Sequence, residues 1–172
     1  MKKNFERFVK IIAILVLGVF AISCGKGGKG SAEPGSIEAI KKAGKIRIGV
    51  FGDKPPFGFV DENGKNQGYD VYLAKRLAKD LLGDENKIEF ITLEAANRVE
   101  YLLSNKVDII LANFTVTDER KQKVDFAKPY MKVSLGIVSP EGAPIKDVKE
   151  LKGKKLIVNK GTTAEIYFTK NY

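Results

Sequence analysis

Residues 46–112 alternate between short apolar runs and amphipathic segments, and this alternation limits the folds that the chain can adopt. Ile46, Ile48 and Val50 follow the period of two that is typical of a strand, whereas the apolar residues of 70–82 recur with helical spacing. The expected strands are 46–50, 88–93 and 107–112, and the expected helices are 70–82 and 95–104. This order of strands and helices predicts a doubly wound α/β domain with a parallel sheet.

Further elements are expected on both sides of this segment. Ser36 and Gly44 are suited to cap a short helix over 37–43, and Asp61-Glu62-Asn63-Gly64 is suited to the turn of a small hairpin. The other expected elements are a short helix over 118–123 capped by Thr117, a strand over 133–137, a helical turn over 147–151, a strand over 156–158 and a helix from 162 onward. Since one strand and two helices cannot close a sheet, we expect the sequence to stop inside a second domain. The alternative is that this last segment packs on the first domain.

Composition excludes several classes of function. The net charge is +9, but six basic residues and a single acid lie in the first thirty positions, and the other charges are mixed in sign. This distribution argues against a nucleic-acid partner. The chain has one cysteine and no histidine, so it cannot form an internal disulfide and lacks the usual zinc-ligand and Cys-His catalytic patterns. We therefore expect no metal, no cofactor and no catalysis.

The first residues resemble an export signal. Basic residues precede an apolar run over 11–22, which as a helix would extend about 18 Å and would not cross a hydrocarbon layer of about 30 Å. Ala21-Ile22-Ser23-Cys24 resembles a bacterial lipobox, although Ala21 stands where such motifs usually carry leucine. We expect a signal peptide over 1–23, acylation of Cys24, a flexible tether over 24–35 and a lipid-anchored protein that faces the periplasm or the cell exterior. The alternative is a signal peptide followed by an incidental cysteine.

Polar residues gather directly after the expected strand 107–112. Asn113, Phe114, Thr115 and Arg120 lie within eight positions, at the edge of a parallel sheet where ligands usually bind. The planar guanidinium of Arg120 can hold a carboxylate through two parallel hydrogen bonds. The alternative is a solvated arginine that pairs with an acidic neighbour on its own helix.

Short motifs along the chain resemble the polar amino-acid-binding family of ABC-transporter solute-binding proteins, extracellular family 3. They are residues 51–57 (FGDKPPF), 68–71 (GYDV), 105–110 (NKVDII), 117–120 (TDER), 124–126 (VDF), 129–130 (PY) and 160–165 (KGTTAE). The resemblance covers about 37–172. It implies a periplasmic-binding-protein-like fold of type II, in which two lobes close on the ligand. Lobe 1 would be 36–138, and 139–172 would form the hinge and the beginning of an incomplete lobe 2.

The resemblance also implies the roles of individual residues. Arg120 would bind the α-carboxylate of an amino acid, Asn113 and Thr115 would hold its α-amino group, and Gly161, Thr162 and Thr163 would meet the carboxylate from the other lobe. A monomer would deliver the amino acid to an ABC permease and its ATPase, and a lipid on the N-terminus would hold it at the membrane.

Three positions bear on which amino acid is bound. Arg98 matches a position that lines the side-chain pocket in some relatives, or it is a surface arginine of a helix. Phe114 is either an apolar wall of the pocket or part of the core. Lys54 stands where many relatives carry an aromatic lid, so Phe51 or Phe57 would take over that contact. Residues 95–115 resemble the cysteine-binding members, which suggests cysteine as the ligand.

Two other classes of function are compatible with the same fold. One is an enzyme similar to cyclohexadienyl dehydratase, which would need a positioned acid or base in the cleft. The other is a sensory or adhesin solute-binding domain. Fold alone does not separate these classes from a transport receptor.

Overall fold

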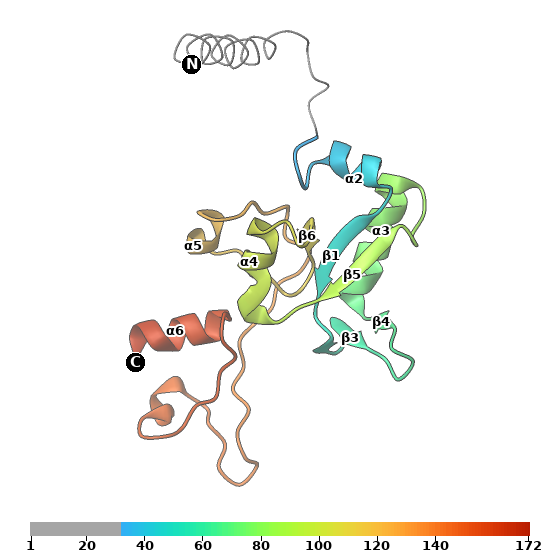
Figure 1. Cartoon of the computed structure of the whole chain (residues 1–172). Coiled ribbons are helices and arrows are strands. Elements are labelled where there is room, and N and C mark those ends of the chain that lie inside the picture. Colours follow the sequence, from blue (N-terminus) through green and yellow to red (C-terminus); the bar gives the residue numbers. More distant parts are fainter. Residues whose placement is uncertain (1–31) are drawn as a thin grey trace, which may run out of the picture. The chain divides into compact units, whose positions relative to one another are not determined.

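The structure is a computed structural model that describes residues 32–172, of which 33–172 form one unit (Figure 1). The predicted signal peptide (1–23), Cys24 and most of the predicted tether (24–35) lie outside the described residues. None of the helices within 32–172 has both the length and the apolar character that crossing a membrane requires.

A three-stranded parallel sheet organises this unit. Strand β1 (Ile46–Val50) lies in the centre, between β5 (Ile88–Thr92) and β6 (Ile109–Ile110). Ile48 is in register with Phe90 on one side and with Ile109 on the other. Because parallel neighbours require a crossover, the helical segments between these strands are a necessary part of the arrangement. The parallel α/β arrangement predicted from the alternating pattern is confirmed.

Helix α3 (Tyr69–Leu82) covers one face of this sheet and forms the main core with it (Figure 1). Val71, Ala74 and Ala78 are buried against the fully buried Ile46 and Ile48. Burying each such isoleucine contributes about 1.5–3 kcal/mol. The core therefore fixes β1, whose carboxyl end leads into the candidate site.

Glycine is required immediately before α3. Gly68 has a φ of 111°, which side-chain-bearing residues rarely adopt, and a Cβ at this position would lie 2.3 Å from the carbonyl oxygen of Phe57. The turn that leads from Asn66–Gln67 into α3 thus depends on a residue without a side chain.

Two of the smaller elements follow the sequence predictions. Helix α2 (Ile37–Ala43) begins at Ser36, whose hydroxyl accepts a hydrogen bond from the Ala39 N–H at 3.2 Å, and ends at Gly44 in the left-handed conformation. The hairpin belongs to a small antiparallel sheet of β2 (Asp53–Lys54), β3 (Gly58–Val60) and β4 (Asn66–Gln67).

The helical segment predicted over 95–104 is divided in the structure. It consists of a 3₁₀ turn η1 (Ala95–Asn97) followed by α4 (Arg98–Leu103). The Ala95 carbonyl accepts a hydrogen bond from the Nε–H of Arg98, so a side chain takes an acceptor that a continuous helix would use. The strand predicted over 107–112 is also shorter than expected, since only Ile109–Ile110 is paired as β6.

The strands predicted over 133–137 and 156–158 are wrong. Val133 and Leu135 are 53% and 63% exposed, and Ile157 is 93% exposed. A strand exists only through a ladder of hydrogen bonds with a neighbour, and no strand of the described chain pairs with either segment. The remaining elements are α5 (Asp118–Lys121), the 3₁₀ helix η2 (Val148–Leu151) and α6 (Thr163–Asn171).

Candidate functional site

The candidate site lies where the three parallel strands end. Phe51 follows β1, Ala95 and Arg98 follow β5, and Asn113 follows β6. Among residues 32–172 the buried charged side chains are Asp70, Arg98 and Arg120. A buried charge is costly unless hydrogen bonds or an opposite charge compensate it, so these three groups need such partners more than any others in the described residues.

Arg98 is held by main-chain carbonyl groups from three segments. Its Nε donates to the oxygen of Ala95 at 2.9 Å, and its Nη1 donates to Ala112 at 3.0 Å and to Asn113 at 3.1 Å. Its Nη2 donates to Gly161 at 2.8 Å. The residue is 3% exposed, so it is not the surface arginine that was the alternative interpretation.

Arg120 donates to the carbonyl group of Gly161 as well, from helix α5. Thr117 caps α5 by accepting a hydrogen bond from the Arg120 N–H at 3.2 Å. The Nη1 of Arg120 donates to the oxygen of Thr115 at 2.7 Å, and its Nη2 donates to Gly161 at 2.9 Å. With 6% exposure, Arg120 is not a solvated helix residue either.

One aromatic ring contacts both guanidinium groups. The Cζ atoms of Arg98 and Arg120 lie 4.7 Å and 4.6 Å from the ring centroid of Phe114. Arg98 also lies 5.6 Å from the ring of Phe51, which is itself buried. The negative face of an aromatic ring attracts a cation, so these rings offset part of the cost of burying the two charges.

No carboxylate within residues 32–172 forms an ion pair with either arginine. Burial, and to a smaller extent the charge of Arg120, lowers the pKa of Arg98 to about 10. Burial also lowers the pKa of Arg120, which nearby Glu119 partly opposes. Both groups are still cationic at neutral pH, so the arrangement is electrostatically suited to an anionic ligand.

The start of α6 faces this pair of arginines. Gly161, which accepts from both, has a φ of 76°, and the helix begins two residues later. The Thr162 hydroxyl accepts from the Glu165 N–H at 3.2 Å. This cap leaves the N–H groups of Thr163 and Ala164 for another acceptor, at the end of the helix that favours negative charge.

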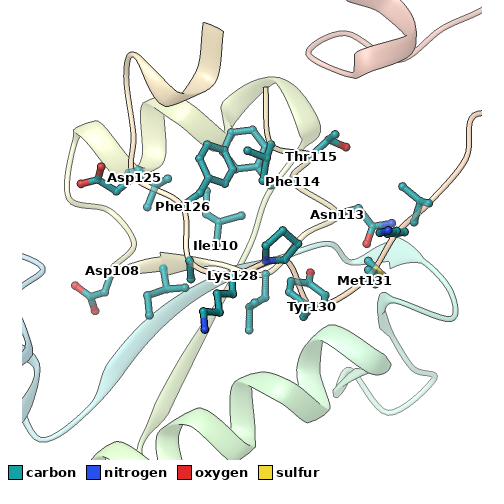
Figure 2. Close-up of a pocket in the computed structure, with 18 residues that line it drawn as sticks. Asp108, Ile110, Asn113, Phe114, Thr115, Asp125, Phe126, Lys128, Tyr130 and Met131 are labelled. Atoms are coloured by element: carbon teal, nitrogen blue, oxygen red, sulfur yellow. The ribbon is translucent and has the colours of Figure 1, made fainter. Parts of the chain in front are cut away.

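Two cavities border the site, and they differ in character. A cavity of 120 Å³ is lined by Phe114, Arg120 and Gly161, among others. A larger one of 590 Å³ runs along β6 and residues 125–133 and is mainly apolar (Figure 2). Phe114 and Phe126 lie side by side there, with ring centroids 5.2 Å apart (Figure 2). The smaller cavity is the candidate binding site because an arginine faces it.

The structure brings together most of the residues singled out from the sequence. Arg98 contacts Phe51, Phe114 and Gly161, and Arg120 contacts Phe114 and Gly161. The main chains of Asn113 and Thr115 accept hydrogen bonds from the arginines. Phe57 is different. It lies in the turn between β2 and β3, and no hydrogen bond or cation–π contact of the described residues joins it to the arginines.

The sequence pattern missed the pair formed by Asp70 and Tyr130. The Tyr130 hydroxyl donates to Oδ1 of Asp70 at 2.9 Å, whereas Oδ2 is buried without a partner among the described residues. Burial raises the pKa of Asp70, and the contact with Tyr130 opposes the rise. The helical pattern of 70–82 did not predict this pair, because an acidic residue such as Asp70 is common in the first turn of a helix.

Residues 46–170 match the family described as bacterial extracellular solute-binding proteins, family 3. The chain belongs to this family. The α/β fold of the periplasmic-binding-protein type predicted from the sequence is thereby confirmed for the family 3 protein.

Individual relatives of this family 3 protein have names that specify ligands. An ABC transporter glutamine-binding protein of Bacillus subtilis is 36% identical over 166 residues, which are 90% of this chain and 61% of that protein. The crystal structure of a cysteine-binding protein from Campylobacter jejuni is 64% identical, with a TM-score of 0.78 over 79% of this chain and 55% of the other. A solute receptor for L-cysteine from Neisseria gonorrhoeae is 66% identical, with a TM-score of 0.78 over 80% and 56%. The chain thus spans just over half the length of these proteins.

The pH dependence of stability tests the buried position of Asp70. The folded protein holds the Asp70 proton more tightly than the unfolded chain, so stability contributed by Asp70 falls as the pH rises above its ordinary pKa of 3.8. Denaturation with urea, followed by circular dichroism, should therefore show wild type losing stability relative to Asp70→Asn as the pH is raised from 3.8.

Asp61→Asn provides a control, because the pKa of Asp61 is shifted in the opposite direction to that of Asp70. The hydrogen bond from the Gln67 side chain, together with those from main-chain N–H groups, lowers the pKa of the exposed Asp61. Wild type should therefore keep its full stability advantage over Asp61→Asn above pH 3.8 and lose it as the pH falls below 3.8. If wild type instead gained stability relative to Asp70→Asn as the pH rose above 3.8, this result would contradict the burial of the carboxyl group.

Proposed function

We propose that this protein binds a small polar amino acid outside the cytoplasm and delivers it to an ABC importer, without chemical conversion of the ligand. The observation that carries the proposal is the pair of buried guanidinium groups that share one aromatic ring and one carbonyl acceptor but have no carboxylate partner among residues 32–172. An amino acid supplies such a carboxylate. The names of the related proteins, which are binding proteins, support binding rather than catalysis.

Arg120 is the group that we assign to the α-carboxylate. A guanidinium has five N–H donors, and Arg120 uses two of them within the described chain. Three remain, which is enough for two parallel hydrogen bonds to a carboxylate. Gly161, Thr162 and Thr163 approach the same anion from the start of α6, where the N–H group of Thr163 has no acceptor among the described residues.

The α-ammonium group is assigned to the loop after β6. The carbonyl oxygens of Asn113 and Thr115 each accept one hydrogen bond from an arginine, and a carbonyl oxygen can accept a second. The Thr115 hydroxyl is a further acceptor on an exposed residue. Phe114 and Phe51 form the apolar side of this site.

Cysteine is the ligand that we favour. Two receptors with cysteine in their names are 64% and 66% identical to this chain, compared with 36% for the glutamine-binding relative. A cavity of 120 Å³ also favours a small side chain over a large one.

We further propose how the chain is placed and divided. Residues 1–23 direct export, Cys24 is acylated, and residues 24–35 tether the folded part to the membrane that holds the permease and the ATPase. Residues 36–138 form lobe 1, and 139–172 contribute the hinge and part of lobe 2. The receptor acts as a monomer, since closure around the ligand takes place between lobes of one chain.

Substitution of Arg120 tests the assigned carboxylate contact. Arg120→Lys keeps the charge but loses the planar fork, so affinity for L-cysteine should fall by about tenfold or more. Titration calorimetry on the full-length protein measures this affinity. The matched control is Arg76→Lys on the exposed face of α3, which should leave affinity unchanged. Equal affinities for Arg120→Lys and wild type would refute the assignment.

Substitution of Cys24 tests the membrane anchor. Cys24→Ala removes the only thiol of the chain, so incorporation of a labelled fatty acid should be lost and the protein should move from the membrane fraction to the soluble fraction. Cell fractionation and metabolic labelling measure the two effects. A variant that still fractionates with the membrane would show that Cys24 does not provide the anchor.

A further inference from the structure

The two buried arginines differ in how many donors they leave free. Arg98 uses four of its five N–H donors on the carbonyl groups of Ala95, Ala112, Asn113 and Gly161. Arg120 uses only two. One remaining N–H cannot form the two parallel hydrogen bonds that make a guanidinium a strong carboxylate ligand. Arg98 is therefore poorly equipped to hold a ligand, although it lies in the same cluster.

The partners of Arg98 instead identify a mechanical role. They belong to η1, to the loop after β6 and to the turn before α6, and Gly161 in that turn is 63 residues from Arg98 in the sequence. We propose that Arg98 is a positioning residue that latches the Gly161 turn onto the loop after β6 and thereby keeps the ligand site closed, without contacting the ligand. This inference rests on the proposed function.

The packing around Gly161 supports a latch at this point. A Cβ on Gly161 would lie 2.7 Å from the Cα of Ala96 and 2.9 Å from the carbonyl oxygen of Ala95. The turn thus touches the main chain of η1 directly, and its carbonyl group reaches both guanidinium groups only because no side chain intervenes. Arg98 anchors the same η1 segment through Ala95, so one side chain fixes both surfaces of this contact.

Electrostatics links the latch to the ligand. Docking the Gly161 turn buries two cations near one ring, and main-chain carbonyl groups supply only partial negative charge. A carboxylate on Arg120 would supply the missing charge and make the docked arrangement more favourable. Ligand binding and the Arg98 latch should therefore stabilise each other, and loss of the latch should appear mainly as faster release of the ligand.

The test compares Arg98→Lys with wild type in the full-length protein. Lysine retains the charge but, with one compact ammonium group, cannot span three segments. Stopped-flow measurements with L-cysteine, L-serine and L-glutamine should show a dissociation rate raised by about tenfold or more for every ligand that binds, with association rates changed by less than about threefold. The order of affinities among the three amino acids should stay the same. Arg76→Lys is the control and should change none of these values.

A second variant displaces the acceptor and leaves Arg98 in place. Gly161→Ala forces the turn away from Ala96 and should raise the dissociation rate in the same way. Gly153→Ala is its matched control, because Gly153 has nearly the same φ, 75° against 76°, but has open space around its Cβ position. Gly161→Ala therefore tests the latch even if Arg98→Lys does not fold.

Hydrogen exchange of the ligand-free protein separates this inference from the proposed function. Peptides that cover residues 112–115 and 161–165 should exchange faster in Arg98→Lys than in wild type. If wild type binds no amino acid, the proposed function fails, and hydrogen exchange still decides whether the latch exists. A changed order of affinities would show that Arg98 contacts the ligand side chain, and unchanged dissociation rates and exchange would show that it latches nothing. Either result would overturn the inference.

Discussion

Two arginine side chains are buried without a carboxylate partner among residues 32–172, and this burial is the constraint on which the rest of the site depends. A buried charge needs compensation, and here it comes from main-chain carbonyl groups and from the ring of Phe114. Those carbonyl groups are available because the chain leaves β5 and β6 at the same edge of a parallel sheet. The core around β1 and α3 therefore supports the site indirectly, by fixing where the strands end.

This compensation is incomplete, and the remaining positive charge favours an anionic ligand. Carbonyl groups carry partial charges, whereas two guanidinium groups carry a full charge each, so the surroundings of Arg120 favour an added anion. The start of α6 contributes in the same direction through its free N–H groups. Among the described residues, these features converge at one small cavity rather than along the larger apolar groove beside β6 (Figure 2).

Local patterns predicted the parallel sheet and the capped helices, because each of these depends on a few neighbouring residues. Patterns also marked Arg120 as a candidate for binding a carboxylate, whereas Gly161 was singled out only through the resemblance to the family. The predicted strands over 133–137 and 156–158 were wrong because a strand needs a hydrogen-bonded neighbour, which an alternating pattern does not reveal. The contacts of Arg98 could not be predicted from the sequence either. Its partners are main-chain carbonyl groups, which every residue possesses, so no side-chain pattern marks them. The pair of Asp70 and Tyr130 was also not predicted, because the two residues are 60 positions apart and no local pattern connects them.

The central claim is that the cluster around Arg120 recognises the carboxylate of a free amino acid. The most direct measurement compares L-cysteine with cysteamine, the same molecule without its carboxylate, by titration calorimetry on the full-length protein. L-Cysteine should bind clearly, and the affinity for cysteamine should be at least about tenfold lower than that for L-cysteine. Equal affinity for the two compounds would contradict the central claim, because the buried guanidinium groups would then have no part in recognition.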